Sequence, residues 1–86
     1  MRKMERDGIV INVVEHIIIR NMWEYYITDE KTDDKDLKFG LVMGFETELG
    51  YIYMPELAPY VISKTKNLNE VMAAGGWSWV DEEEEV

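Results

Sequence analysis

The sequence predicts a single small α+β domain, built on an antiparallel sheet of about four strands with one or two short helices. Apolar residues alternate with period two along 9–27 and 37–54, and polar or glycine-containing segments separate these runs. The 86 residues make one domain, large enough for an apolar core without a metal or a disulfide. We divide the chain into a flexible arm at 1–7, the domain at 8–80 and an acidic tail at 81–86.

Residues 37–54 carry the clearest local signal. A polar segment ending in Gly50 separates two apolar runs, which is the pattern of a β-hairpin. Gly40 and Gly44 leave one face of the first strand empty, so we expect a bulge, a covering aromatic side chain or a close backbone there. The inner face of that strand is predicted to hold Leu37, Phe39, Leu41, Met43 and Phe45.

Residues 9–27 are rich in β-branched and aromatic side chains, which favours strands over a helix. Because one strand of that length would be unusual, we expect a break at 20–22. A helix over 9–20 is the alternative. His16, the single histidine, lacks a second positioned group or a nucleophile in recognisable context, so we predict a surface or strand-edge histidine and no catalytic residues.

The last third of the chain predicts short elements. Two prolines limit any helix at 54–60 to about one turn. A second helix is predicted at 68–74, with Asn67 or Asn69 as its N-cap and Gly75 closing its C-terminus.

Composition excludes several chemistries. The chain has no cysteine and one histidine, which removes thiolate nucleophiles, disulfides and Cys- or His-cluster metal sites, and we predict no cofactor. The net charge of −9 disfavours contact with nucleic acid or anionic lipid and favours a basic protein surface as partner. No apolar run has the length of a membrane span or the form of a signal peptide, and we expect a cytoplasmic protein.

The acidic segment 29–36 invites a comparison with calcium-binding loops. An EF-hand loop starting at Asp29 would need glycine at Asp34 and glutamate at Gly40, and the sequence has neither. We predict a solvated connection, with weak cation binding as the alternative.

Three segments resemble a family of small uncharacterised domains found in bacteria and on phages and other mobile elements. They are WEYYITD at 23–29, FGLVMGFETELGY at 39–51 and EL at 56–57. The resemblance covers roughly residues 23–57. It implies an α+β domain and a mobile-element setting, and the family supplies no activity to carry over.

These observations favour a small acidic protein-interaction domain that binds a basic protein surface, in its sharpest form an inhibitor that mimics nucleic acid. Mimicry requires carboxylates arrayed on one face. One alternative is a metal-assisted enzyme that uses Glu46, Glu48 or Glu56 with a divalent cation. The other is a soluble domain whose acidity serves solubility alone. The candidate partner-binding residues are Asp33, Asp34, Glu46, Glu48 and Glu56.

Overall fold

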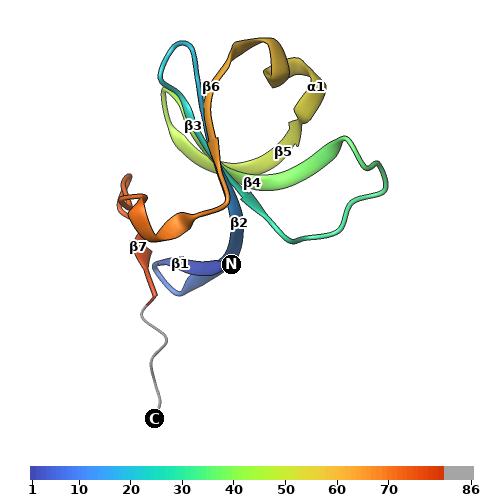
Figure 1. Cartoon of the computed structure of the whole chain (residues 1–86). Helices are drawn as coiled ribbons and strands as arrows, with labels where there is room; N and C mark the ends of the chain where they lie inside the picture. The colour runs from blue at the N-terminus through green and yellow to red at the C-terminus, as the bar shows by residue number, and fades with distance from the viewer. Residues whose placement is uncertain (81–86) are drawn as a thin grey trace.

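The computed structural model describes residues 1–80, which form an antiparallel sheet and a short helical corner (Figure 1). The sequence-predicted acidic tail at 81–86 lies outside the described residues. The elements in chain order are β1 (Arg2–Arg6), β2 (Ile9–Ile19), β3 (Glu24–Thr28), β4 (Leu37–Met43), β5 (Thr47–Tyr53), α1 (Met54–Leu57), the 3-10 helix η1 (Ala58–Tyr60), β6 (Val61–Thr65), the 3-10 helix η2 (Leu68–Glu70) and β7 (Ser78–Trp79).

The sheet has the strand order β5-β4-β3-β2-β1-β7, and β6 also pairs with β2. β1 pairs with residues 9–13 of β2 and β6 pairs with residues 16–19, so these two strands share the edge of β2 that faces away from β3. α1 and η1 connect β5 to β6 across the open side of the curled sheet (Figure 1).

The fold prediction is confirmed in part. The sheet is antiparallel and the hairpin at 37–54 forms as β4 and β5, and strands rather than a helix occupy 9–27 with a turn at 20–22. The sheet has seven strands rather than about four, and the helical elements are single turns, so the domain is mostly β. The two prolines hold α1 and η1 to this length, as expected.

The N-terminal segment is not the flexible arm that its polarity predicted. Residues 2–6 pair with β2 along their whole length, and the Met4 side chain is completely buried. Asp7 and Gly8 both have positive φ, which is the backbone of a tight two-residue hairpin turn. The N-terminal strand therefore belongs to the core.

A β-bulge in β2 places apolar residues on both faces of the sheet. Val13 pairs with Thr28 and Glu15 pairs with Ile27, so the residue between them is extra. Odd-numbered residues before the bulge, such as Val13, face one core, whereas odd-numbered residues after it, such as Ile17, face the other. The apolar residues of β2 alternate without a break in the sequence, but those before the bulge and those after it lie on opposite faces of the sheet.

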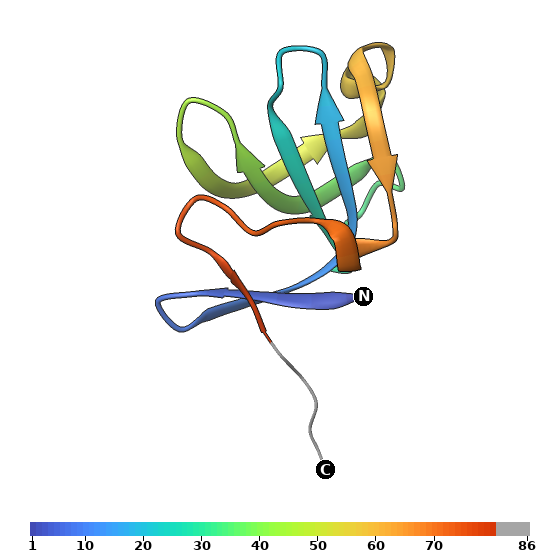
Figure 2. The same ribbon diagram turned by 60° about the vertical axis from the view of Figure 1, so that its left-hand side comes forward.

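The first core lies under residues 66–77, which we call the strap because they cross one face of the sheet (Figure 2). The strap carries Leu68 and Trp77 onto the sheet and ends at β7, which pairs with β1. The first core consists of Met4, Ile11, Val13, Tyr26, Leu41, Leu68 and Trp77.

The second core lies on the opposite face of the sheet. It is covered by the helical corner through Leu57, with Val61 of β6 packed against it. Its buried members are Ile17, Ile19, Tyr25, Ile27, Ile52 and Leu57. None of the helices within residues 1–80 is long and apolar enough to cross a membrane.

The helix predicted at 68–74 is wrong. Asn67 caps η2, since its Oδ1 accepts from the Asn69 N–H at 3.3 Å, but helical backbone stops after Glu70. Val71 is extended, and its carbonyl accepts a hydrogen bond from the Trp79 indole N–H at 2.7 Å. Contacts to the sheet therefore replace intrahelical hydrogen bonds along the strap.

The expected inner face of β4 is only partly buried. Leu41 is fully buried, but Phe45 lies in the turn with 95% of its surface exposed. The two glycines behave as predicted: Gly40 lies against the main-chain carbonyl of Tyr26, and Gly44 lies under the Trp23 ring.

Candidate functional site

The five predicted partner-binding residues lie around the β4–β5 hairpin and are divided between its two ends. Asp33 and Asp34 precede β4, and Glu46 lies in the turn between the strands. Glu48 is the second residue of β5, and Glu56 lies in α1 after β5. All five side chains are exposed. The seven-residue β4 separates the two ends of the hairpin by about 20 Å, at about 3.3 Å per residue.

The end of the hairpin where β4 begins and β5 ends is not purely acidic. The Met54 N–H donates to the Asp36 carbonyl at 2.9 Å, which brings the start of β4 beside the end of β5. The surface there includes Lys31, Lys35 and Lys38 among the carboxylates of residues 29–34. Carboxylates are therefore split into two groups, with lysines in one of them, which argues against an array that imitates a phosphate backbone.

An aromatic strip continues the first core beyond the cover of the strap. Phe39 pairs with Tyr51 and Leu37 pairs with Tyr53, so all four side chains share the face of buried Leu41. Tyr51 is 65% exposed and Tyr53 is 44% exposed, and the Phe39 and Tyr51 rings meet edge to face at 5.3 Å. This strip lies along β5, the edge strand of the sheet.

A second candidate site centres on His16, which is buried rather than on the surface or at a strand edge as predicted. His16 pairs with Tyr26 on one side and Thr65 on the other, and Ile18 pairs with Glu24 and Ser63. Because paired and alternate residues share a face, these six side chains form two rows on one face of the sheet.

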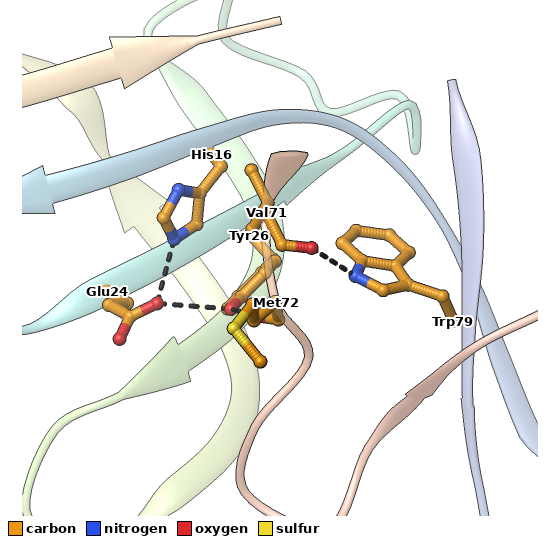
Figure 3. A network of polar contacts seen from close by, with 6 residues as sticks. All are labelled: His16, Glu24, Tyr26, Val71, Met72 and Trp79. Atoms are coloured by element: carbon orange, nitrogen blue, oxygen red, sulfur yellow. Dashed lines mark hydrogen bonds and ion pairs between the residues drawn. The ribbon is translucent and has the colours of Figure 1, made fainter. Parts of the chain in front are cut away.

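Glu24 is the centre of the polar contacts in these rows (Figure 3). Its Oε1 lies 2.8 Å from His16 Nε2 and 3.1 Å from the Tyr26 hydroxyl. The Tyr26 hydroxyl is also 3.2 Å from the Met72 carbonyl of the strap. The network therefore holds the Glu24 carboxylate in place and ties the strap to the sheet.

The contacts determine which ring nitrogen of His16 is a donor. A carboxylate only accepts hydrogen bonds, so His16 Nε2 carries a proton and donates to Glu24. In the neutral imidazole Nδ1 is then an acceptor. Burial first, then the charge of Glu24 and the hydrogen bond to it, raises the pKa of Tyr26 well above its ordinary value, so its hydroxyl stays a donor.

A groove of about 460 Å³ opens beside this network, between the sheet and the strap. His16, Ile18 and Glu24 line it from β2 and β3, and Ser63 and Thr65 line it from β6. Strap residues from Asn67 to Ala74 form the other wall. The groove combines fixed hydrogen-bonding groups with aliphatic walls, which is the general character of a small-ligand site.

Sequence reasoning missed His16, Glu24 and Tyr26 as a group. The spacing of Glu24 and Tyr26 places them on one face of a strand, which was a usable signal. Their contact with His16 depends on the register after the β2 bulge, and the groove depends on where the strap crosses. Neither is visible in local sequence pattern.

Within residues 1–80 no three His, Asp or Glu side chains are grouped closely enough to hold a metal ion. Comparison of the chain with family models, curated proteins and solved structures found no match, and the resemblance of residues 23–57 to small bacterial and phage domains stays a prediction.

Proposed function

We propose that this chain is a small acidic protein-interaction domain that takes up an extended basic segment of a partner protein along the edge of β5. The observation that carries this proposal is the exposed strand edge itself. β5 pairs with β4 on one side, and within residues 1–80 no strand pairs with its other side. Such an edge offers backbone donors and acceptors for an added strand.

β5 lacks the features that usually protect an edge strand. Its sequence TELGYIY contains neither proline nor lysine, and its single charged residue is Glu48. Exposed Tyr51 and Tyr53 stand beside the edge, and tyrosine is enriched where proteins contact one another. The edge therefore supports strand addition, with alternate side chains of the partner packing on the aromatic strip.

Charge defines the partner. Residues 29–56, which span the hairpin and its flanks, contain eight acidic and three basic side chains, a net charge of −5. A lysine- or arginine-containing segment is attracted to this surface, and an acidic one is repelled. The two groups of carboxylates lie near the two ends of β5, where the ends of an added strand would lie.

The geometry favours this form over the two sharper hypotheses from sequence. A nucleic-acid mimic needs a continuous array of carboxylates, and here they form two groups at the ends of the hairpin, with lysines in one of them. A metal-assisted enzyme would use Glu46, Glu48 or Glu56 with a divalent cation, and within residues 1–80 none of these carboxylates belongs to a group of three side chains that could hold one.

Selection from a random library of displayed twelve-residue peptides tests the proposal. We expect the enriched peptides to carry lysine or arginine at alternate positions and to bind less tightly as salt rises. The double variant Tyr51→Ala with Tyr53→Ala should lose at least about tenfold in affinity. Tyr60→Ala is the matched control, because Tyr60 is 49% exposed but lies on η1.

Enrichment of neutral or acidic peptides would contradict the proposed partner class. Equal loss in the Tyr60 variant, or no loss in the double variant, would remove β5 as the binding edge.

A further inference from the structure

We propose that the groove between the strap and strands β2, β3 and β6 is a binding site for a small organic cation, an ammonium or guanidinium group carried on a short aliphatic chain. This site is separate from the β5 edge and does not depend on the proposed function. Four kinds of observation support it: the acceptors that line the groove, the charge of its walls, the fixed position of Glu24, and its size.

The groove contains acceptor atoms that no residue of the described chain satisfies. His16 donates through Nε2 to Glu24, and its Nδ1 makes no hydrogen bond to any described residue. Glu24 uses Oε1 for both of its contacts, and its Oε2 makes no hydrogen bond within residues 1–80. Ser63 and Thr65 add hydroxyl oxygens. A ligand with N–H donors can satisfy the free carboxylate oxygen of Glu24 and these hydroxyl oxygens.

The groove is also negatively charged. Glu24 and Glu70 line it, and its lining contains no lysine or arginine. Glu24 is two-thirds buried, at 33% side-chain exposure, so its charge is less screened than that of a surface carboxylate. A bound cation would compensate this charge, whereas an anion would be repelled by both carboxylates.

The carboxylate of Glu24 is held in place before any ligand arrives. His16 and Tyr26 both donate to Oε1, and Tyr26 is itself packed in the first core (Figure 3). Little side-chain entropy is then lost on binding, which is the benefit of a preorganised site.

Size and wall chemistry indicate an organic rather than an inorganic cation. The volume of about 460 Å³ is far more than one hydrated ion requires and lies within the range of small-molecule sites. Ile18, Val71 and Ala73 provide aliphatic surface beside the carboxylates. An alkyl chain would cover this surface while its cationic head reaches Glu24.

Titration of the full chain with butylamine and butylguanidine, followed by amide chemical shifts, tests the site. We expect saturable shifts at millimolar concentration in Ser63, Thr65 and Val71, and none of that size with butanol or butyrate. Glu70→Gln should weaken binding about tenfold, since it removes one charged partner. Glu70 has an exposed side chain at the rim, so this variant should leave the fold intact.

Glu56→Gln is the matched control, because it removes the same charge from α1, away from the groove. Three outcomes overturn the site: no saturable shifts with either cation, equal shifts with butanol, or equal weakening by Glu56→Gln and Glu70→Gln. Magnesium or zinc chloride that shifts the same amides as strongly would replace the organic cation with an inorganic one and also overturn it.

Acetylarginine amide distinguishes two sources of the same chemistry. Binding tighter than that of butylguanidine would support an arginine side chain of a partner as the occupant. Equal or weaker binding would support a free small amine or guanidine.

Discussion

Gly40 and Gly50 face one another across β4 and β5, yet only Gly50 has room for a side chain. A Cβ at Gly40 would overlap the main-chain carbonyl of Tyr26, whereas a Cβ at Gly50 would meet nothing within 4 Å. Because backbone of a paired strand cannot move aside, Gly40→Ala should lower the free energy of unfolding by about 2 kcal/mol or more.

Gly50→Ala is the control for that change and should stay within about 0.5 kcal/mol of the parent chain. Urea unfolding followed by tryptophan fluorescence measures both variants. Similar losses at the two positions would show that the close approach of β3 to Gly40 has no energetic weight.

Tyr26 links the stability of the fold to pH. Its pKa is raised above the ordinary value of 10.0, so the folded chain keeps a proton that the unfolded chain releases. The resulting stability is fully present below pH 10 and is lost as pH rises above it. We expect the free energy of unfolding to fall as pH rises above about 10.

Tyr26→Phe removes the titrating hydroxyl and should make that fall shallower, with Tyr25 still contributing because burial raises its pKa as well. At neutral pH the variant should be about 1 kcal/mol less stable, since it lacks the single hydroxyl proton that the Glu24 carboxylate and the Met72 carbonyl share as acceptors. Parallel pH curves for the two chains would contradict this role of Tyr26.

At the scale of elements, the sequence contained a signal for the β1–β2 hairpin turn. The prediction of an arm followed the polarity of residues 1–7 instead. Asp-Gly is a strong hairpin signal, and Asp7 and Gly8 form such a turn with φ of 51° and 85°. The segment RKMER has only one apolar residue, Met4, and this polarity led to the prediction of a flexible arm. Its burial under the strap makes β1 part of the core.

Gly8→Val tests how strongly this turn holds β1. A β-branched residue at φ of 85° is strained, so we expect a loss of about 1–2 kcal/mol and faster hydrogen exchange in residues 2–6. Asp7→Asn should be close to neutral, because asparagine tolerates positive φ. Unchanged exchange in β1 after Gly8→Val would mean that the turn contributes nothing to its pairing.

Elements that depend on neighbours in sequence were predictable, and those that depend on distant partners were not. The β4–β5 hairpin and the corner at 54–60 follow from alternation, Gly50 and proline. Residues 68–74 of the strap were predicted as a helix, because local propensity cannot show that Tyr26 and Trp79 contact the carbonyls of Met72 and Val71.

The candidate sites divide in the same way. The acidic residues around the hairpin were found from composition. Predicting the aromatic strip would have required the pairing of β4 with β5 and the point at which the strap stops covering the sheet. Predicting that the rows of His16 and Glu24 share a face would have required knowing that the strand register shifts by one residue at the bulge. A shift of one residue reverses every side chain, so sequence periodicity alone cannot place these rows.

At the scale of the whole molecule, charge and topology act together. The net charge of −9 disfavours self-association, although β5 leaves an open edge that two copies could otherwise share. Repulsion between copies would therefore reserve the edge for a partner of opposite charge. The same repulsion acts within one molecule and destabilises its compact state.

Sodium chloride should consequently stabilise the fold. Ion pairs that salt would weaken are sparse at the surface of residues 1–80, and the Lys64 to Glu15 pair is long at 3.9 Å. Screening of like charges should then dominate as the Debye length falls from about 10 Å at 0.1 M to about 3 Å at 1 M. A gain of 1 kcal/mol corresponds to about 4–8 °C in Tm for a domain of this size, and thermal unfolding measured across this range of salt concentration resolves such a shift.

Chloride is preferred to sulfate because sulfate stabilises folded proteins by exclusion from their surface. A Tm that falls with added chloride would show that attractive pairs outweigh the self-repulsion, and the charge argument for the free β5 edge would then fail with it.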